Sequence, residues 1–128
     1  MKIRVYYEDT DAGGVVYHSN YLNYCERARS EIFFQNGETP IIDDGHFVVR
    51  KMECDFISSA KLGDLLDVDV TIKQIKKVSF ELYQEVKKDN KVLFSATITL
   101  VLAKDGKPKR INQQTKDFLQ RVFDKIDR

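Results

Sequence analysis

The chain has 128 residues, of which 42% are apolar, with 21 lysines and arginines against 20 aspartates and glutamates. Two folding units of about 60 residues would each bury too little surface, so residues 1–128 are expected to form a single domain. The net charge of +1 provides no overall attraction for nucleic acid or an anionic membrane, and neither is predicted as a partner.

The chain shows no sign of export or membrane insertion. Its N-terminal residues lack the apolar run and cleavage site of a signal peptide, and no apolar stretch approaches the ~20 residues that span a bilayer. A cytoplasmic location and no integral membrane segment are therefore expected. Cys25 and Cys54 lie far apart inside apolar segments, which predicts two reduced core thiols.

The first third of the chain contains a strand, a loop and a helix. β-Branched and aromatic residues from Lys2 to Tyr7 predict a short strand, and the polar, glycine-containing residues 8–20 predict a loop. From Tyr21 to Gln35, apolar residues recur at steps of three and four, which predicts a long amphipathic helix. Gly37 is expected to end that helix.

The rest of the chain alternates mainly with a period of two, which is typical of antiparallel strands. Residues 66–73 and 78–86 place apolar side chains on one parity, interrupted only by Gln84, and predict half-buried strands. Residues 47–56 and 92–102 are denser in apolar residues, so they are predicted to be central strands with both faces covered.

Turns and a second helix complete the predicted fold. Residues 87–91 predict a hairpin turn, and Asp105-Gly106 predicts the end of the last strand. Helical spacing predicts an amphipathic C-terminal helix that contains Phe118, Leu119, Val122, Phe123 and Ile126. The resulting order predicts an α+β fold with a five-stranded antiparallel sheet, one long helix and a C-terminal helix. One long helix leaves part of this sheet uncovered, which predicts self-association.

Reactive residue types concentrate in the loop between the first strand and the long helix. They are Glu8, Asp9, Asp11, Tyr17 and His18, with Gly13 and Gly14 between them. Glycine permits a tight turn and close approach to a ligand, and amides at the start of a helix are free to donate to an oxyanion. These features indicate a site, although aspartates and glycines in a polar loop also form simple Asx turns.

The segment from Tyr6 to Leu22, with the sequence YYEDTDAGGVVYHSNYL, resembles the hotdog thioesterases of the hydroxybenzoyl-CoA thioesterase family. The resemblance continues through Glu26–Arg29 and Phe47–Met52 and covers nearly the whole chain. Within that family, the chain resembles the bacterial subgroup associated with the Tol-Pal envelope system. It implies a hotdog fold, in which five antiparallel strands wrap around one long helix. It also implies subunits that pair edge to edge into dimers, which associate into homotetramers.

The resemblance assigns the catalytic carboxylate to Asp11, which precedes Ala-Gly. It implies that Asp11 acts either as a nucleophile on the thioester carbonyl or as a base on water. It also places the backbone amide of His18 over the thioester oxygen, where a fixed donor and the helix dipole stabilise negative charge. The His18 side chain is then an acid, a base or an orienting group, or simply a structural residue.

Further residues are assigned with an alternative beside them. Tyr7 is expected to hydrogen-bond the carboxylate or the substrate, or else to pack within its strand. The residues expected to contact the substrate at the turn and the helix start are Gly14, Val15 and Tyr17. Lys76 and Lys77 occupy the position of a basic pair that meets the nucleotide phosphates of CoA in the family, or they are solvated charges of a hairpin.

The activity implied by this resemblance is hydrolysis of an acyl-CoA thioester to a free carboxylic acid and CoA, with acyl carrier protein as the other carrier to consider. The sequence has no metal-ligand spacing, phosphate loop or nucleophilic-serine elbow, so no metal or cofactor is predicted. Two alternatives stay open. One is a hotdog dehydratase or hydratase of acyl thioesters, and the other is a weakly catalytic or non-catalytic protein that works with envelope or phospholipid-synthesis partners.

Overall fold

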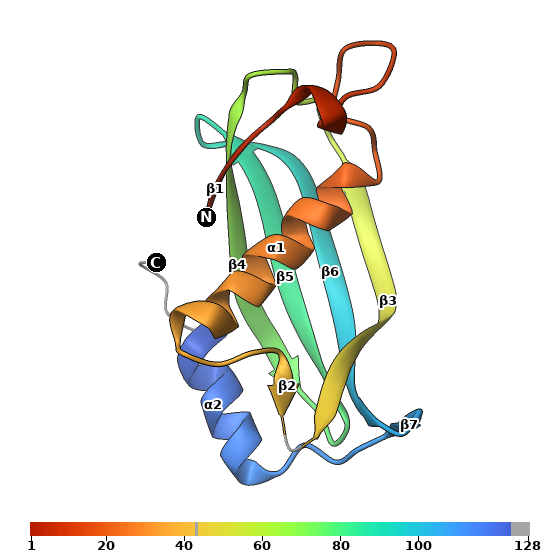
Figure 1. The fold of residues 1–128 in the computed structure, drawn as a ribbon, viewed down its shortest axis with the longest axis vertical. Helices are drawn as coiled ribbons and strands as arrows, with labels where there is room; N and C mark the ends of the chain where they lie inside the picture. Colours follow the sequence, from red (N-terminus) through yellow and green to blue (C-terminus); the bar gives the residue numbers. More distant parts are fainter. Residues whose placement is uncertain (43, 124–128) are drawn as a thin grey trace.

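The strands form one antiparallel sheet that curves around a single long helix (Figure 1). The structure is a computed structural model that describes residues 1–42 and 44–123. Its strands are β1 (Lys2–Arg4), β2 (Ile41–Ile42), β3 (Gly45–Phe56), β4 (Leu65–Ile75), β5 (Ser79–Lys88), β6 (Lys91–Lys104) and β7 (Lys107–Pro108). Their spatial order is β1-β4-β5-β6-β3-β2, and β7 pairs with the end of β6.

The predicted long helix is confirmed as α1 (Asn20–Gln35), which lies across the concave face of the sheet (Figure 1). Its buried residues are Tyr21, Tyr24, Cys25, Ala28, Arg29, Ile32 and Phe33. Gly37 ends the helix as predicted, with a φ of 73° and an N–H that donates to the Phe34 carbonyl at 3.0 Å. The Glu38 N–H donates to the Phe33 carbonyl at 2.9 Å, which completes a Schellman motif.

The C-terminal helix is also confirmed, as α2 (Gln113–Phe123). It buries Leu119, Val122 and Phe123 against the rest of the domain. Ile126 of the predicted apolar stripe lies outside the described residues. Within the described part of the chain, no helix has the length and apolar character needed to cross a membrane.

The two strands predicted to be central have different surroundings. Strand β6 lies between β5 and β3 and is buried over most of its length, so the prediction for residues 92–102 is confirmed. The prediction for residues 47–56 is wrong. Beyond its first two residues, β3 has a described neighbour only on the β6 side, and most of its residues are exposed. Several of its apolar side chains, including Val48, Val49 and Phe56, are therefore exposed to solvent in a single copy of the chain.

The N-terminal strand is shorter than predicted, because it ends at Arg4 rather than Tyr7. The Val5 N–H donates to the Asp64 carbonyl at 2.9 Å, and Tyr7–Asp9 then form a short 3-10 helix, η1. The aromatic residues that suggested a strand are exposed there, with Tyr7 at 82%. The sheet also has two strands more than the five predicted, since β2 and β7 contain two residues each.

Both predicted turns are present, and both have two central residues with positive φ. Asp89 and Asn90 have φ values of 51° and 67° between β5 and β6. Asp105 and Gly106 have φ values of 52° and 76° between β6 and β7. Two successive positive values are typical of the type I′ turns that match the twist of paired strands.

Candidate active site

Asp9 anchors the loop that carries the predicted site. Its buried carboxylate accepts the Tyr6 N–H at 2.9 Å and the Asn20 side-chain amide at 3.1 Å. Because Asn20 is the first residue of α1, this carboxylate joins η1 to the start of the helix. Burial raises the pKa of the neighbouring Tyr24 hydroxyl, and the negative charge of Asp9 raises it further. Asp9 therefore has a structural role, whereas Asp11 does not share this buried environment.

Asp11 lies in a small exposed turn two residues further on. The Gly13 N–H donates to Asp11 Oδ1 at 2.8 Å, which is the Asx turn considered as the structural alternative. Gly14 has a φ of 80°, and its N–H donates to the Asp11 carbonyl at 3.0 Å. Among the described residues, no donor reaches Asp11 Oδ2. The turn therefore orients the carboxylate through one oxygen and leaves the other available for chemistry.

The turn geometry makes Gly13 a test of carboxylate position. A Cβ at residue 13 would lie 3.2 Å from Asp11 Oδ1, closer than ordinary contact allows. We expect Gly13→Ala to lower the kcat of any reaction that uses the Asp11 carboxylate by about tenfold, because a small displacement of a reacting group slows the reaction. The thermal midpoint should stay within about 2 °C, since the site is exposed. Ala12→Ser is the matched control, and equal kcat values for the two variants would contradict this role.

A cavity of about 320 Å³ brings the turn, the start of α1 and the end of β3 together. Its lining residues are Asp11, Val15, Val16, His18, Tyr21, Phe56, Ile57, Ser58 and Ser59. Asp11 and His18 therefore line one cavity, and Val15 lines it with them. Gly14 and Tyr17 are adjacent in sequence but are not among the lining residues.

His18 presents an open backbone amide at the start of α1. The Asn20 N–H already donates to the Tyr17 carbonyl at 2.8 Å, but the His18 N–H has no acceptor among the described residues. Such an amide, at the positive end of a helix dipole, is suited to a developing negative charge. The His18 ring lies 4.4 Å from the Tyr17 ring and meets Phe56 edge-on at 6.3 Å. Aromatic contacts orient the imidazole.

Three of the predicted site residues lie elsewhere in this chain. The prediction that Tyr7 packs within a strand is wrong, because Tyr7 lies in η1 and is exposed to solvent. Tyr7 also does not line the cavity that contains Asp11. Lys76 and Lys77 lie in the turn between β4 and β5, at the opposite end of the sheet from Asp11 (Figure 1). The length of β4 separates these two ends by about 35 Å at the usual strand rise. The lysines line another cavity together with Arg110 and Lys116.

Six cavity residues were not predicted as site residues from the sequence: Val16, Tyr21, Phe56, Ile57, Ser58 and Ser59. Tyr21 was assigned only to the apolar stripe of the helix. Its hydroxyl accepts the Ala60 N–H at 3.0 Å, and its ring stacks on Phe94 at 5.1 Å, so it forms a rigid wall. Nothing in the local pattern of residues 56–59 signals a site, because they reach the cavity only through strand pairing.

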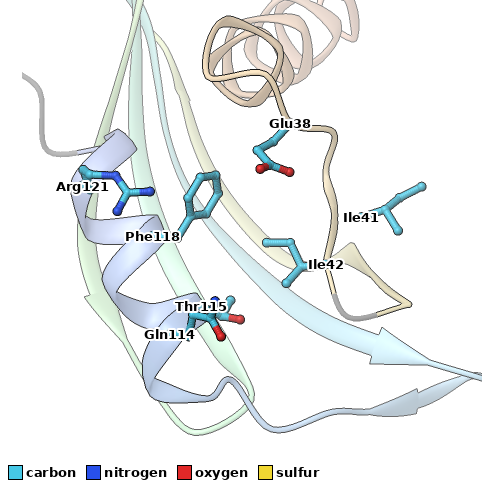
Figure 2. A pocket seen from close by; sticks show the side chains of 7 residues that line it. All are labelled: Glu38, Ile41, Ile42, Gln114, Thr115, Phe118 and Arg121. Carbon is cyan, nitrogen blue, oxygen red and sulfur yellow. The ribbon is translucent and has the colours of Figure 1, made fainter.

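A larger cavity of about 390 Å³ lies between residues 38–42 and α2 (Figure 2). It contains Glu38 and Arg121 beside the apolar side chains of Phe118, Ile41 and Ile42. The start of α2 is capped there, since the Thr115 N–H donates to Asn112 Oδ1 at 2.8 Å. Among the described residues, no group of three or more His, Cys, Asp or Glu side chains could hold a metal.

The fold is an antiparallel sheet around one helix, and the site places a carboxylate beside the start of that helix. Both features are those expected of a hotdog thioesterase. The Thioesterase superfamily model matches residues 13–95, and the chain belongs to this family. The resemblance to thioesterases and the hotdog fold expected from it are confirmed.

Three related proteins illustrate the similarity. Acyl-CoA thioesterase YbgC of Helicobacter pylori strain 26695 is 52% identical over 86 residues, which span 67% of this chain and 65% of the relative, or just under two thirds of its length. Acyl-CoA thioesterase YbgC of Haemophilus influenzae is 36% identical over 113 residues, which span 85% of this chain and 83% of the relative. A thioesterase from Thermus thermophilus, solved with coenzyme A and Zn, superposes with a TM-score of 0.84 at 26% identity. The superposition covers 95% of this chain and 92% of the Thermus chain.

Proposed function

We propose that this protein hydrolyses acyl-CoA thioesters to a free carboxylic acid and CoA. The observation that carries the proposal is one cavity lined by both Asp11 and His18, the residue with the open backbone amide. Two relatives named as acyl-CoA thioesterases and a structural relative with bound coenzyme A support it. The direct test is release of free thiol from a series of acyl-CoA substrates. Hydration of an enoyl-CoA without thiol release would contradict hydrolysis and favour a hydratase.

In the proposed reaction, Asp11 attacks the thioester carbonyl or removes a proton from an attacking water. The carbonyl oxygen gains negative charge, and the His18 N–H donates a hydrogen bond to it. The carbon–sulfur bond then breaks, and the thiolate of CoA leaves and takes up a proton. If Asp11 acts as the base, the oxygen of the attacking water is already in the acid product. If Asp11 acts as the nucleophile, water hydrolyses the resulting acyl–Asp11 anhydride, which releases the acid and restores the carboxylate. A fixed amide at a helix start stabilises this charge without the reorganisation that solvent requires.

The roles of the His18 backbone amide and of its imidazole can be separated by mutation. We expect His18→Ala to lower kcat by about tenfold or less, because the backbone amide remains in place. Steady-state kinetics of thiol release, compared with Asp11→Asn, measure this difference. A loss equal to that of Asp11→Asn would show that the imidazole itself takes part in proton transfer.

We further propose that two copies pair through β3, because its outer edge presents an unpaired ladder. The Ile57 N–H donates to the Leu93 carbonyl of β6 at 2.9 Å. Because backbone groups alternate in direction along a strand, those of Met52 and Cys54 point away from β6. Within the described residues, no strand pairs with them on that side. A second β3 would satisfy this edge, and paired dimers would form the proposed tetramer.

This pairing would complete the substrate site. Around a two-fold axis, the end of β3 near Asp11 lies beside the start of the other β3, at the end of the sheet that carries the basic cavity. Lys76, Lys77, Arg110 and Lys116 line that cavity. Such a basic cluster is suited to the phosphates of CoA. The same charges suit an acidic carrier protein, and a cytoplasmic enzyme would meet both carriers.

A further inference from the structure

Arg29 is a buried cation on α1 that the proposed mechanism does not use. Only 9% of the residue is exposed, and its Nη1 donates to Gln84 Oε1 at 3.3 Å. Gln84 on β5 is fully buried, and its side-chain amide donates to the Cys25 carbonyl at 2.9 Å. That second bond fixes the amide, so its oxygen must face Arg29. Gln84 is also the residue that interrupts the apolar parity of its strand.

No carboxylate of the described residues lies within ion-pair distance of the Arg29 guanidinium. The adjacent Glu26 carboxylate instead accepts the Ser30 hydroxyl at 2.9 Å on the exposed side of the helix. A guanidinium remains charged in proteins, and burying one beside a single neutral amide is unfavourable unless an anion pairs with it. Glu26 lines the same cavity as Arg29 and acts on the Arg29 charge from its exposed side, so no described anion is in direct contact with the guanidinium.

Arg29 lines a cavity of about 300 Å³ between α1 and the sheet, which we term the Arg29 cavity. Its inner walls are mainly apolar and include Phe33, Phe47, Phe80, Leu82 and Leu100. The Phe47 ring meets Phe80 edge-on at 5.0 Å and tilts against Phe33 at 5.9 Å. The exposed lining residues are Glu26, Ile41, His46 and Val49, so the mouth lies between α1 and the edge formed by β2 and β3.

We propose that the Arg29 cavity binds an apolar group that ends in a carboxylate. Arg29 would take the carboxylate through paired N–H···O bonds, and the aromatic walls would cover the apolar part. Two sources have this chemistry: a free carboxylic acid, and an acyl-CoA whose far end carries a second carboxylate. The second source rests on the proposed function, whereas the binding site itself does not.

Hexanoate and its neutral analogue hexanamide test the site in the purified protein. Calorimetric titration should show hexanoate binding at least about tenfold more tightly than hexanamide, because charge-assisted hydrogen bonds exceed neutral ones. Arg29→Met should remove this preference, and Glu26→Gln, which changes only the rim, should retain it. Equal affinity for the two probes, or no hexanoate binding because a carboxylate of a second copy already occupies Arg29, would overturn the proposal.

Gln84→Glu provides a test that does not depend on losing the cation. The new carboxylate would keep the acceptor for Arg29 Nη1 and supply the missing anion internally. The variant loses the donor that Gln84 offers to the Cys25 carbonyl, so circular dichroism must first show that it is folded. We expect the folded variant to lose hexanoate binding. A folded Gln84→Glu variant that binds hexanoate as the parent does would also overturn the proposal.

Kinetics with dodecanedioyl-CoA and dodecanoyl-CoA then distinguish the two sources, because the helix rises about 13 Å from Asn20 to Arg29 and only a long chain spans that distance. A preference for dodecanedioyl-CoA that disappears in Arg29→Met assigns the carboxylate to the substrate. Turnover of dodecanoyl-CoA without that preference, alongside hexanoate binding, assigns it to free acids. Hexanoate binding without hydrolysis of any acyl-CoA would leave the Arg29 cavity supported and contradict only the proposed function.

Discussion

Replacing Asp11 with Asn is expected to lower kcat for acyl-CoA hydrolysis by roughly 10²- to 10⁴-fold, the range associated with loss of an acid–base group. Asparagine keeps the size of the side chain and an oxygen that accepts the Gly13 N–H, so the turn should persist. Because the carboxylate is exposed and the turn is retained, the thermal midpoint should change little. The loss should appear in kcat, with KM nearly unchanged.

Glu8→Gln is the matched control for this prediction. Glu8 is an exposed carboxylate in the same loop and does not line the cavity that contains Asp11 and His18. Its kcat should stay within about twofold of the parent, in line with the small effects of surface substitutions. An Asp11→Asn enzyme that works at the parent rate would remove Asp11 from the mechanism and leave it as a turn residue.

Blocking the outer edge of β3 is expected to have the second large effect. Proline at position 54 removes an N–H that points away from β6, so the bonds within this chain remain while pairing to a second β3 is lost. Light scattering at micromolar concentration should then report a monomer rather than a dimer or tetramer. Hydrolysis should fall by roughly 10²-fold or more, because a site completed by a second copy loses its geometry.

Cys54→Ala separates the backbone effect from loss of the thiol. Alanine shortens the half-buried side chain but keeps the N–H, so assembly and kcat should remain close to those of the parent. Circular dichroism of both variants checks that the sheet is retained. A folded Cys54→Pro monomer with full specific activity would refute both the β3 interface and a site shared between copies.

The elements of this fold were predictable wherever a local pattern had a single physical cause. The stripe from Tyr21 to Gln35 predicts α1 because only one helical face is apolar, and Gly37 ends it because a positive φ is easiest for glycine. The alternation in β4 and β5 likewise reports one buried face. The pattern failed in β3, because apolar density has the same appearance whether another strand of this chain or a second chain covers it.

For the site, the sequence by itself determined the loop that carries Asp11 and His18, since the motif is contiguous and lies directly before a helix. It also determined that Gly14 permits the turn there. Only the tertiary structure decided which distant residues join it, because Ser58 and Ser59 reach the cavity through the pairing of β3 with β6. It likewise decided that Lys76 and Lys77 lie at the far end of the sheet and that Arg29 and Gln84, 55 residues apart, form a buried hydrogen bond. Such contacts depend on strand register and helix placement, which no local pattern of residues encodes.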